Sequence, residues 1–175
     1  ELNRIKPVWI ELGLQTIHEE SAKFIRRGYP LKVFEEQVYR LRNKNIDVIV
    51  HTILGLPNET KHDMLMTMEY LAGLPIQGIK LQLLHILRDT DLGVMYEQGL
   101  ITPLDLDSYI DILVSCLEML PPHIVIHRLT GDGPKDKLLA PIWSMNKKMV
   151  LNRICKFMKE HDSFQGKYAT GQAKS

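Results

Sequence analysis

The stretch Val8-Trp9-Ile10-Glu11-Leu12-Gly13-Leu14-Gln15 decides the fold class of this sequence. Its side chains alternate in character, and strict alternation predicts a β-strand. One face would carry only apolar residues and is suited to packing under helices: Val8, Ile10, Leu12 and Leu14. The other face, with Glu11 and Gln15, is too polar to lie under helices as well. It therefore fits the inside of a barrel better than the middle of a helix-covered sheet.

Strand and helix patterns alternate along the rest of the chain. Further strands are expected at 48–55, 78–87 and 123–129. Helices are expected after a Thr16–Glu19 capping box, over 31–43, after a Thr60–Asp63 capping box, after Thr102-Pro103, and over 143–159. This order predicts an α/β fold with parallel strands and right-handed crossovers. In the third strand Lys80 and Gln82 oppose Ile79, Leu81 and Leu83, which again favours an arc of a barrel.

Composition and charge narrow the class of protein. With 175 residues and 45% hydrophobic content the chain can bury one core. It carries 22 Lys and Arg against 21 Asp and Glu, so no overall charge points to nucleic acid or to a membrane surface. No apolar run approaches the roughly 18–20 residues of a membrane span. The absence of a signal peptide predicts a cytoplasmic protein, and the absence of an initial Met suggests a start further upstream. One domain is expected over 1–162, followed by a disordered tail over 163–175.

Polar residues stand where the expected strands end. Glu11 and Gln15 share a face at the carboxyl end of the first strand, where parallel α/β folds bind ligands, so both could reach one molecule. An equally good interpretation is that they solvate a lumen or that Glu11 pairs with Lys80. In the second strand Gly55 and Pro57 shape a loop whose backbone can lie against a flat ligand. An ordinary βα turn capped by Thr60 explains the same pattern.

The two cysteines, Cys116 and Cys155, lie 39 residues apart and have no CxxC spacing. A metal site made by this chain alone is therefore not expected. Cys116 falls in an apolar helical pattern, where a small buried hydrophobe is the better interpretation.

Four motifs in order resemble one branch of the radical S-adenosylmethionine (SAM) superfamily. They are the segments at 8–16, 24–29, 50–57 and 81–92, and the resemblance extends over approximately 5–160. The branch contains the catalytic subunit of Elongator and the oxygen-independent coproporphyrinogen oxidases. The chain as a whole, with the segments at 127–132 and 143–148, is most similar to the YhcC/YtqA-type radical SAM proteins.

The resemblance implies the C-terminal part of a partial (β/α)6 TIM-like barrel with outer helices. Family members hold a [4Fe–4S] cluster in a CxxxCxxC loop after the first strand, which this chain lacks. The cluster donates an electron that cleaves SAM to a 5′-deoxyadenosyl radical. In the full-length protein we expect that cluster, an electron donor such as flavodoxin or ferredoxin, and an unknown substrate, for which an RNA-related molecule is one candidate. The chain by itself is expected to be inactive.

By position in the family motifs, Gln15 matches the residue that touches the SAM ribose, and Arg27 the arginine that meets the SAM carboxylate. His51 falls where the coproporphyrinogen branch has an acidic ribose ligand and the Elongator branch has His. Residues 53–57 match the adenine-contacting motif in shape only, because His51 replaces its first Gly and Asn58 its Glu.

The resemblance also implies a lumen lined by the later strands. Gln82 is expected among the cofactor-binding residues and Lys80 below the substrate. His127 and Arg128 are expected to face substrate, although only one of them can point inward if that strand is regular.

Two other classes of protein remain as alternatives. The chain can be a non-catalytic αβ module that binds protein or RNA, although its near-zero net charge gives no support for strong RNA binding. It can also be another SAM- or phosphate-using barrel, but the sequence contains no P-loop and no GxGxxG fingerprint.

Overall fold

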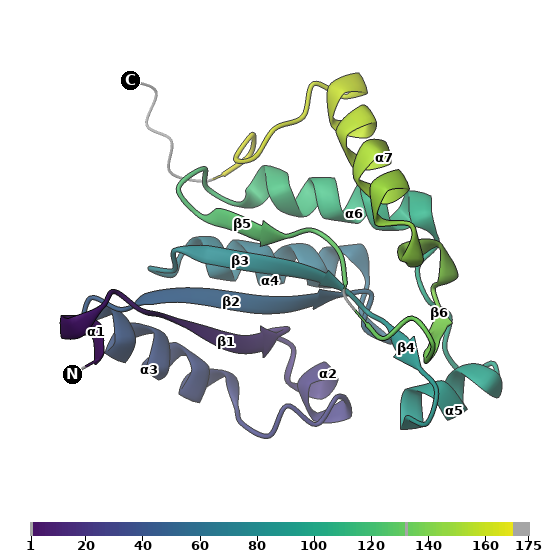
Figure 1. Ribbon diagram of the computed structural model, residues 1–175, viewed down its shortest axis with the longest axis horizontal. Coiled ribbons are helices and arrows are strands. Elements are labelled where there is room, and N and C mark those ends of the chain that lie inside the picture. Colours follow the sequence, from purple (N-terminus) through teal and green to yellow (C-terminus); the bar gives the residue numbers. More distant parts are fainter. Residues whose placement is uncertain (1, 132, 170–175) are drawn as a thin grey trace.

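Four parallel strands form the centre of the structure, a computed structural model that describes residues 2–131 and 133–169 (Figure 1). Their order is β1-β2-β3-β5. The bounds are Trp9–Gln15 for β1, Asp47–Leu54 for β2, Gly78–Leu83 for β3 and Val125–Arg128 for β5. All neighbouring pairs are parallel, as the alternation of strands and helices predicted. The α/β class and the incomplete barrel are thereby confirmed.

Helices cover one face of this sheet. The helices in the described part of the chain are α1 (Leu2–Ile5), α2 (Glu19–Phe24), α3 (Leu31–Arg42), α4 (Lys61–Ala72), α5 (Asp91–Glu97), α6 (Leu106–Met119), α7 (Lys147–Glu160) and the 3₁₀ helix η1 (Ile142–Met145), and not all of them lie on that face. The main core lies between the sheet and α3, α4, α6 and α7. In the described part of the chain, no helix combines the length and the apolar content needed to cross a membrane.

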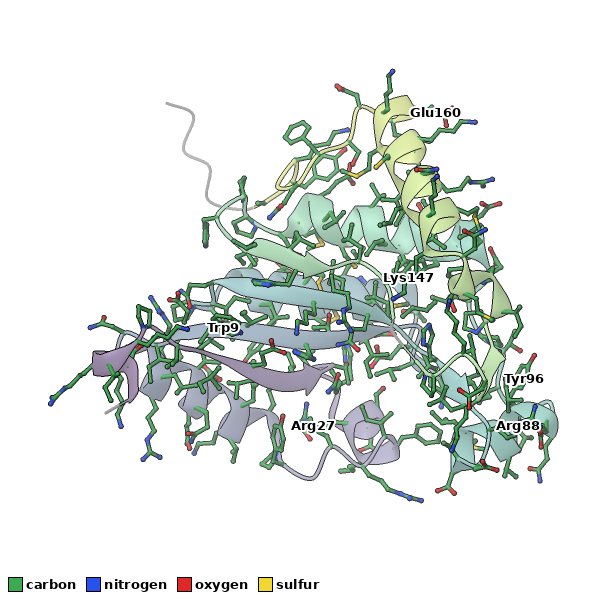
Figure 2. The ribbon with its side chains drawn as sticks, viewed as in Figure 1. Trp9, Arg27, Arg88, Tyr96, Lys147 and Glu160 are labelled. Atoms are coloured by element: carbon green, nitrogen blue, oxygen red, sulfur yellow. The ribbon has the colours of Figure 1, made fainter. Side chains whose placement is uncertain are left out.

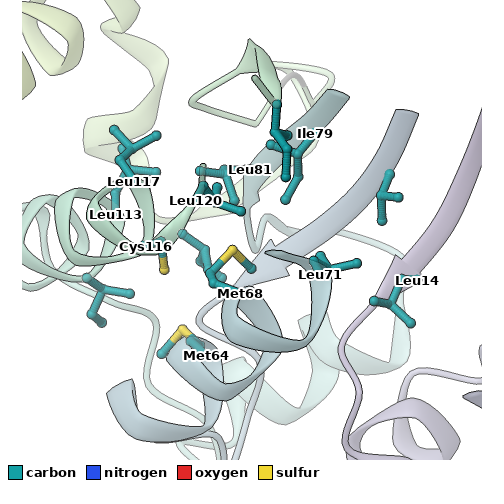
Figure 3. Close-up of a cluster of buried hydrophobic side chains, with 14 of the residues drawn as sticks. Leu14, Met64, Met68, Leu71, Ile79, Leu81, Leu113, Cys116, Leu117 and Leu120 are labelled. Carbon is teal, nitrogen blue, oxygen red and sulfur yellow. The ribbon is translucent and has the colours of Figure 1, made fainter. Parts of the chain in front are cut away.

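The core is built from one face of each strand. Leu14, Ile79 and Leu81 are fully buried there against Met68 and Leu71 of α4 (Figure 3). Cys116 of α6 lies in the same cluster, so its prediction as a small buried hydrophobe is confirmed. Because strand side chains alternate, the residues between these core positions lie on the opposite face of the sheet, which we call the open face.

The chain leaves the sheet after Leu83, so the expected strand over 78–87 was wrong in its second half. Ile86–Leu87 instead form β4, which pairs antiparallel with β6 (Leu138–Ala140). With α5 these strands lie beyond the carboxyl ends of β1–β3 (Figure 1). The apolar run continues past Leu83 because Leu84 and Ile86 are buried in a second, smaller cluster. The sequence pattern of a continuous apolar run does not show where the chain passes from one sheet to another.

Two of the predicted helix starts were wrong. His18, not Thr16, precedes α2 and makes no side-chain cap, while the Glu19 carboxylate accepts from the backbone N–H of Leu31. Asp105, not Thr102, caps α6 by accepting from the N–H of Ser108. The box at Thr60 and Asp63 is confirmed, with both reciprocal bonds present.

The last long helix also begins later than predicted. The segment at 142–145 is the 3₁₀ helix η1, and α7 starts only after Asn146, whose side chain accepts from the N–H of Met149. An Asn side chain satisfies a free N–H of the first turn, and the helix starts there.

The segment 163–169 is not the disordered tail that was predicted. The N–H of Gly166 donates to the carbonyl of Leu117, and that of Tyr168 to the carbonyl of Glu118. The Gln165 side chain donates to the carbonyls of Pro121 and Ile124. The first two bonds satisfy carbonyls in the last turn of α6 and the Gln165 bonds satisfy carbonyls of the segment that follows it, which explains why a polar segment docks there. Residues 170–175 lie outside the described part of the chain.

The capping box of α4 gives a first prediction. Thr60→Ala should lower the free energy of unfolding by about 1 kcal/mol, because the N–H of Asp63 loses its acceptor. Urea unfolding followed by circular dichroism measures this. Thr102→Ala, at an exposed threonine that caps no helix, is the matched control and should change stability by less than about 0.5 kcal/mol. Equal losses in the two variants would contradict the assignment of the cap.

Candidate cofactor and substrate site

A row of polar residues crosses the open face. In the strand register Gly13 of β1 lies beside His51 of β2, His51 beside Lys80 of β3, and Lys80 beside Arg128 of β5. Laterally adjacent residues of a parallel sheet share a face. The row therefore brings together three of the predicted site residues from three strands.

The Glu11 carboxylate links this row. Its Oε2 atom lies 2.6 Å from Nε2 of His51 and 2.5 Å from Nζ of Lys80. The indole N–H of Trp9 donates to Oε1 at 3.4 Å. The pairing of Glu11 with Lys80, which the sequence left as one of two interpretations, is therefore present. The Lys80 side chain is only 16% exposed, so its charge needs this partner.

The orientation of His51 follows from its two neighbours. The Gln82 amide nitrogen lies 3.0 Å from Nδ1 and donates to it, so Nδ1 is the unprotonated nitrogen. Nε2 then carries the proton and donates to Glu11. Both ring nitrogens are thus used within the protein. The ribose contact predicted for His51 stays a prediction, and in this arrangement it requires exchange of one of these bonds.

The electrostatics of this network keep Glu11 ionised. Hydrogen bonds from Lys80 and then from His51 lower the pKa of the Glu11 carboxyl from 4.5 to about 2. A carboxylate that accepts several charge-assisted bonds is stabilised in its charged form. The open face therefore holds one fixed negative charge beside the Lys80 ammonium group.

Gln15 lies at an irregular end of β1. The register shifts between Gly13 and Gln15, and Gln15 has a left-handed backbone with φ of 66°. Its amide nitrogen lies 2.8 Å from the place where a Cβ on Gly13 would stand, so a side chain at position 13 would displace the amide from this position. Within residues 2–131 and 133–169, the Gln15 side chain makes no hydrogen bond. A strained residue with an unused amide at a strand end is typical of a binding position.

Arg27 lies below the tip of β1, three residues beyond the end of α2 rather than on that helix (Figure 2). Its guanidinium donates to the carbonyls of Leu14, Thr16 and Tyr29 and to the Glu19 carboxylate. Four of its five N–H donors are used and the side chain is 2% exposed. The SAM-carboxylate role of Arg27 stays a prediction. The arrangement itself is that of a buried support for the end of β1.

Gly55 and Pro57 lie apart from the polar row. Gly55 has φ of 83°, and the space for its Cβ is filled by Leu104, so its close neighbour is a side chain of the protein. Pro57 lines a cavity of about 790 Å³ at the carboxyl ends of β1 and β2, together with His18, Glu19 and Asp63. This volume is within the range of small-molecule pockets. Of the sequence-predicted cofactor residues, Glu11, Gln15, His51 and Gln82 thus lie on the open face and Pro57 lines this cavity. Arg27 and Gly55 lie in neither place.

Both His127 and Arg128 face the open side. The register shifts between Ile79 and Lys80, which leaves His127 as an extra residue in β5. Ile126 and Leu129, on either side of the pair, both pack against the core. The His127 ring lies over Gly78, with Nε2 2.5 Å from the place of a Cβ there. The prediction that only one of the two points inward assumed a regular strand, and the bulge makes that assumption wrong.

The described residues do not offer a ligand set for an iron–sulfur cluster. Cys116 is buried in α6 and Cys155 is exposed on α7. In the described ranges no three His, Cys, Asp or Glu side chains are grouped closely enough to hold a metal ion.

Comparisons with known proteins agree with this architecture. The model of the Radical SAM superfamily matches residues 1–71, and that of the Radical_SAM C-terminal domain matches residues 76–160. The chain is 42% identical to YtqA of Bacillus subtilis, over 96% of this chain and 52% of that protein. It is 30% identical to YhcC of Escherichia coli, over 88% of this chain and 50% of that protein.

A solved structure shows the same fold. The archaeal Methanocaldococcus infernus Elp3 superposes with a TM-score of 0.82 over 94% of this chain and 38% of that one, at 17% identity. The two family models, which follow one another along the sequence, show that this chain is a member of the radical SAM superfamily. It spans about half the length of the curated relatives that it matches.

Sequence reasoning missed two residues of the site. Gly13 was seen only as part of an alternating strand, although its missing side chain makes room for Gln15. Tyr29 donates its hydroxyl to the Gly13 carbonyl and so ties the next turn to β1. The glycine in the middle of a strand pattern was the available signal, because such a glycine marks a bulge or a close approach.

The depressed pKa of Glu11 predicts a pH dependence. Because its folded pKa lies below the unfolded value, its contribution is present above pH 4.5 and is lost as the pH falls toward 2. Glu11→Gln should flatten the fall in unfolding free energy over this window, measured by urea unfolding from pH 5 to pH 2. The exposed Glu97→Gln is the control and should leave the slope as in the parent protein. An unchanged slope in Glu11→Gln would show that the ion pair does not hold in solution.

The burial of Arg27 predicts a structural loss. Arg27→Ala leaves the Thr16 carbonyl without its donor and removes one of the two bonds to the Leu14 carbonyl, so it should lower the free energy of unfolding by about 2 kcal/mol. The control is Arg40→Ala, at an exposed arginine of α3, which should cost less than about 0.5 kcal/mol. If the two variants unfold at the same urea concentration, Arg27 does not support the strand.

Proposed function

We propose that this chain forms the SAM-binding half of a radical SAM enzyme and that Gln15 contacts the ribose of SAM. The observation that carries the proposal is the Gln15 amide, held over Gly13 at the carboxyl end of β1 in a chain of this superfamily. An amide both donates and accepts, so it suits a pair of ribose hydroxyls. Because the amide makes no hydrogen bond within the described part of the chain, a ligand need not break one to reach it.

The rest of the pocket follows from neighbouring residues. The loop at 53–57 would lie against the adenine ring. Arg27 retains one Nη2–H for the SAM carboxylate, beside the Glu19 carboxylate that already bonds to Nη2. When SAM and a reduced [4Fe–4S] cluster are both bound, SAM supplies a 5′-deoxyadenosyl radical. We infer that the cluster, its electron donor and the turnover belong to a protein longer than this chain.

The Glu11 network would set the charge of the pocket. SAM bears a positive sulfonium centre, and an uncompensated Lys80 ammonium on the same face would repel it. Glu11 lies 2.5 Å from Lys80 and stays ionised, so that repulsion is offset. Gln82 and Glu11 hold the His51 ring between them, which gives this face a fixed shape.

The proposal predicts where SAM binds. In an NMR titration of SAM into the ¹⁵N-labelled chain, the backbone amides of Gly13, Gln15 and Gly55 should shift in a saturable manner. Gln15→Ala should weaken binding about fivefold, the effect of one neutral hydrogen bond of about 1 kcal/mol. Gln98→Ala, at an exposed glutamine after α5, should bind as the parent chain does. Equal affinity of both variants for SAM would overturn the assignment of Gln15.

A further inference from the structure

The row His51, Lys80, Arg128 places two cationic groups, Lys80 and Arg128, side by side on the open face. Lys80 and Arg128 are register partners on adjacent strands. Like charges in such neighbouring positions repel each other and destabilise a sheet. Surface lysines and arginines usually avoid this by pointing into solvent, but Lys80 is 16% exposed and Arg128 is half-buried. The arrangement therefore has a cost in stability.

One carboxylate does not balance the row. Glu11 bonds to Lys80 and His51 at one end of it. Within the described part of the chain, no carboxylate forms an ion pair with Arg128, and its guanidinium makes no hydrogen bond there. Two fixed positive charges thus face one negative charge, and the excess lies at Arg128. A half-buried guanidinium is stabilised when an anion accepts its hydrogen bonds.

The bulge in β5 places a second donor beside this charge. Because Ile126 and Leu129 both pack in the core, His127 and Arg128 are presented together to the open face. The His127 ring is exposed and held over Gly78, where any side chain would collide with it. A regular strand would have turned one of the two residues toward the helices. The irregularity thus joins a planar fork of N–H donors to an imidazole.

We propose that Arg128 and His127 bind an anionic group of the substrate, a carboxylate or a phosphate. The proposal rests on the proposed function, because it takes the open face as the place where substrate meets SAM. The planar guanidinium matches either oxyanion with two parallel bonds. The chemistry therefore assigns the substrate to the class of acids or phosphate esters rather than to neutral or cationic molecules.

The first test uses inorganic phosphate. Added to the labelled chain at constant ionic strength, phosphate should shift the Arg128 side-chain Nε–H and the His127 ring signals in a saturable manner, whereas chloride should not. Arg128→Gln should weaken phosphate binding by at least about tenfold, the loss of one charge-assisted bond. Arg128→Lys, which keeps the charge but not the fork, should fall between. Lys148→Gln, at an exposed residue of α7, should bind phosphate as the parent chain does.

A second arm separates the substrate's anion from the carboxylate of SAM. With SAM present, phosphate should still shift the Arg128 signal, and SAM alone should leave that signal in place. Displacement of phosphate by SAM would assign the site to the cofactor and overturn the proposal. Absence of a saturable phosphate shift at Arg128 would also overturn it, while SAM shifts at Gln15 would leave the proposed function intact. Phosphate binding without SAM shifts at Gln15 would instead overturn the proposed function.

Discussion

The Glu11 carboxylate holds together residues from three neighbouring strands. Parallel strands place laterally adjacent residues on one face, so His51 and Lys80 must stand side by side on the open face. A lysine there, mostly removed from water, requires a counter-charge. Glu11 provides it through Oε2, and the same atom accepts a hydrogen bond from the Nε2–H of His51. The other ring nitrogen of His51, Nδ1, is then free to accept from Gln82. The orientation of every polar group in this network therefore depends on one carboxylate.

The end of β1 shows how local strain and support are combined. Where the strand ends at the bulge, the Thr16 carbonyl needs a donor, because buried backbone groups are costly when unpaired. Arg27 supplies that bond from the turn after α2 and adds a second donor to the Leu14 carbonyl, which also accepts from the Thr16 N–H. The Tyr29 hydroxyl donates to the Gly13 carbonyl. These bonds hold Gln15 in a left-handed conformation that it would not adopt alone. The same turn thus supports the end of β1 and leaves the Gln15 amide without a hydrogen bond in the described part of the chain.

Sequence reasoning predicted what depends on local periodicity. The alternation in β3 and at Leu12 and Leu14 of β1 correctly separated the core face from the open face, whereas Ile10 is exposed. The Thr60 box correctly placed the start of α4. The bulges at Gly13 and at His127 could not be predicted, because they arise from the hydrogen-bond register with a neighbouring strand. The pairing of β4 with β6 could not be predicted for a related reason, because the two strands lie about fifty residues apart in the chain.

The framework alone does not assign the chemistry of these residues. The likeness to the archaeal Elp3, at 17% identity, concerns the path of the chain, and one fold supports many reactions. The residues differ in whether their side chains already make hydrogen bonds within the protein, and this difference indicates which of them can bind a ligand. His51 and Arg27 are largely occupied within the protein, whereas Gln15 and Arg128 retain their donors within the described part of the chain. A ligand gains most from groups that need not break an internal bond to meet it, so Gln15 and Arg128 are where ligand binding has the smallest cost.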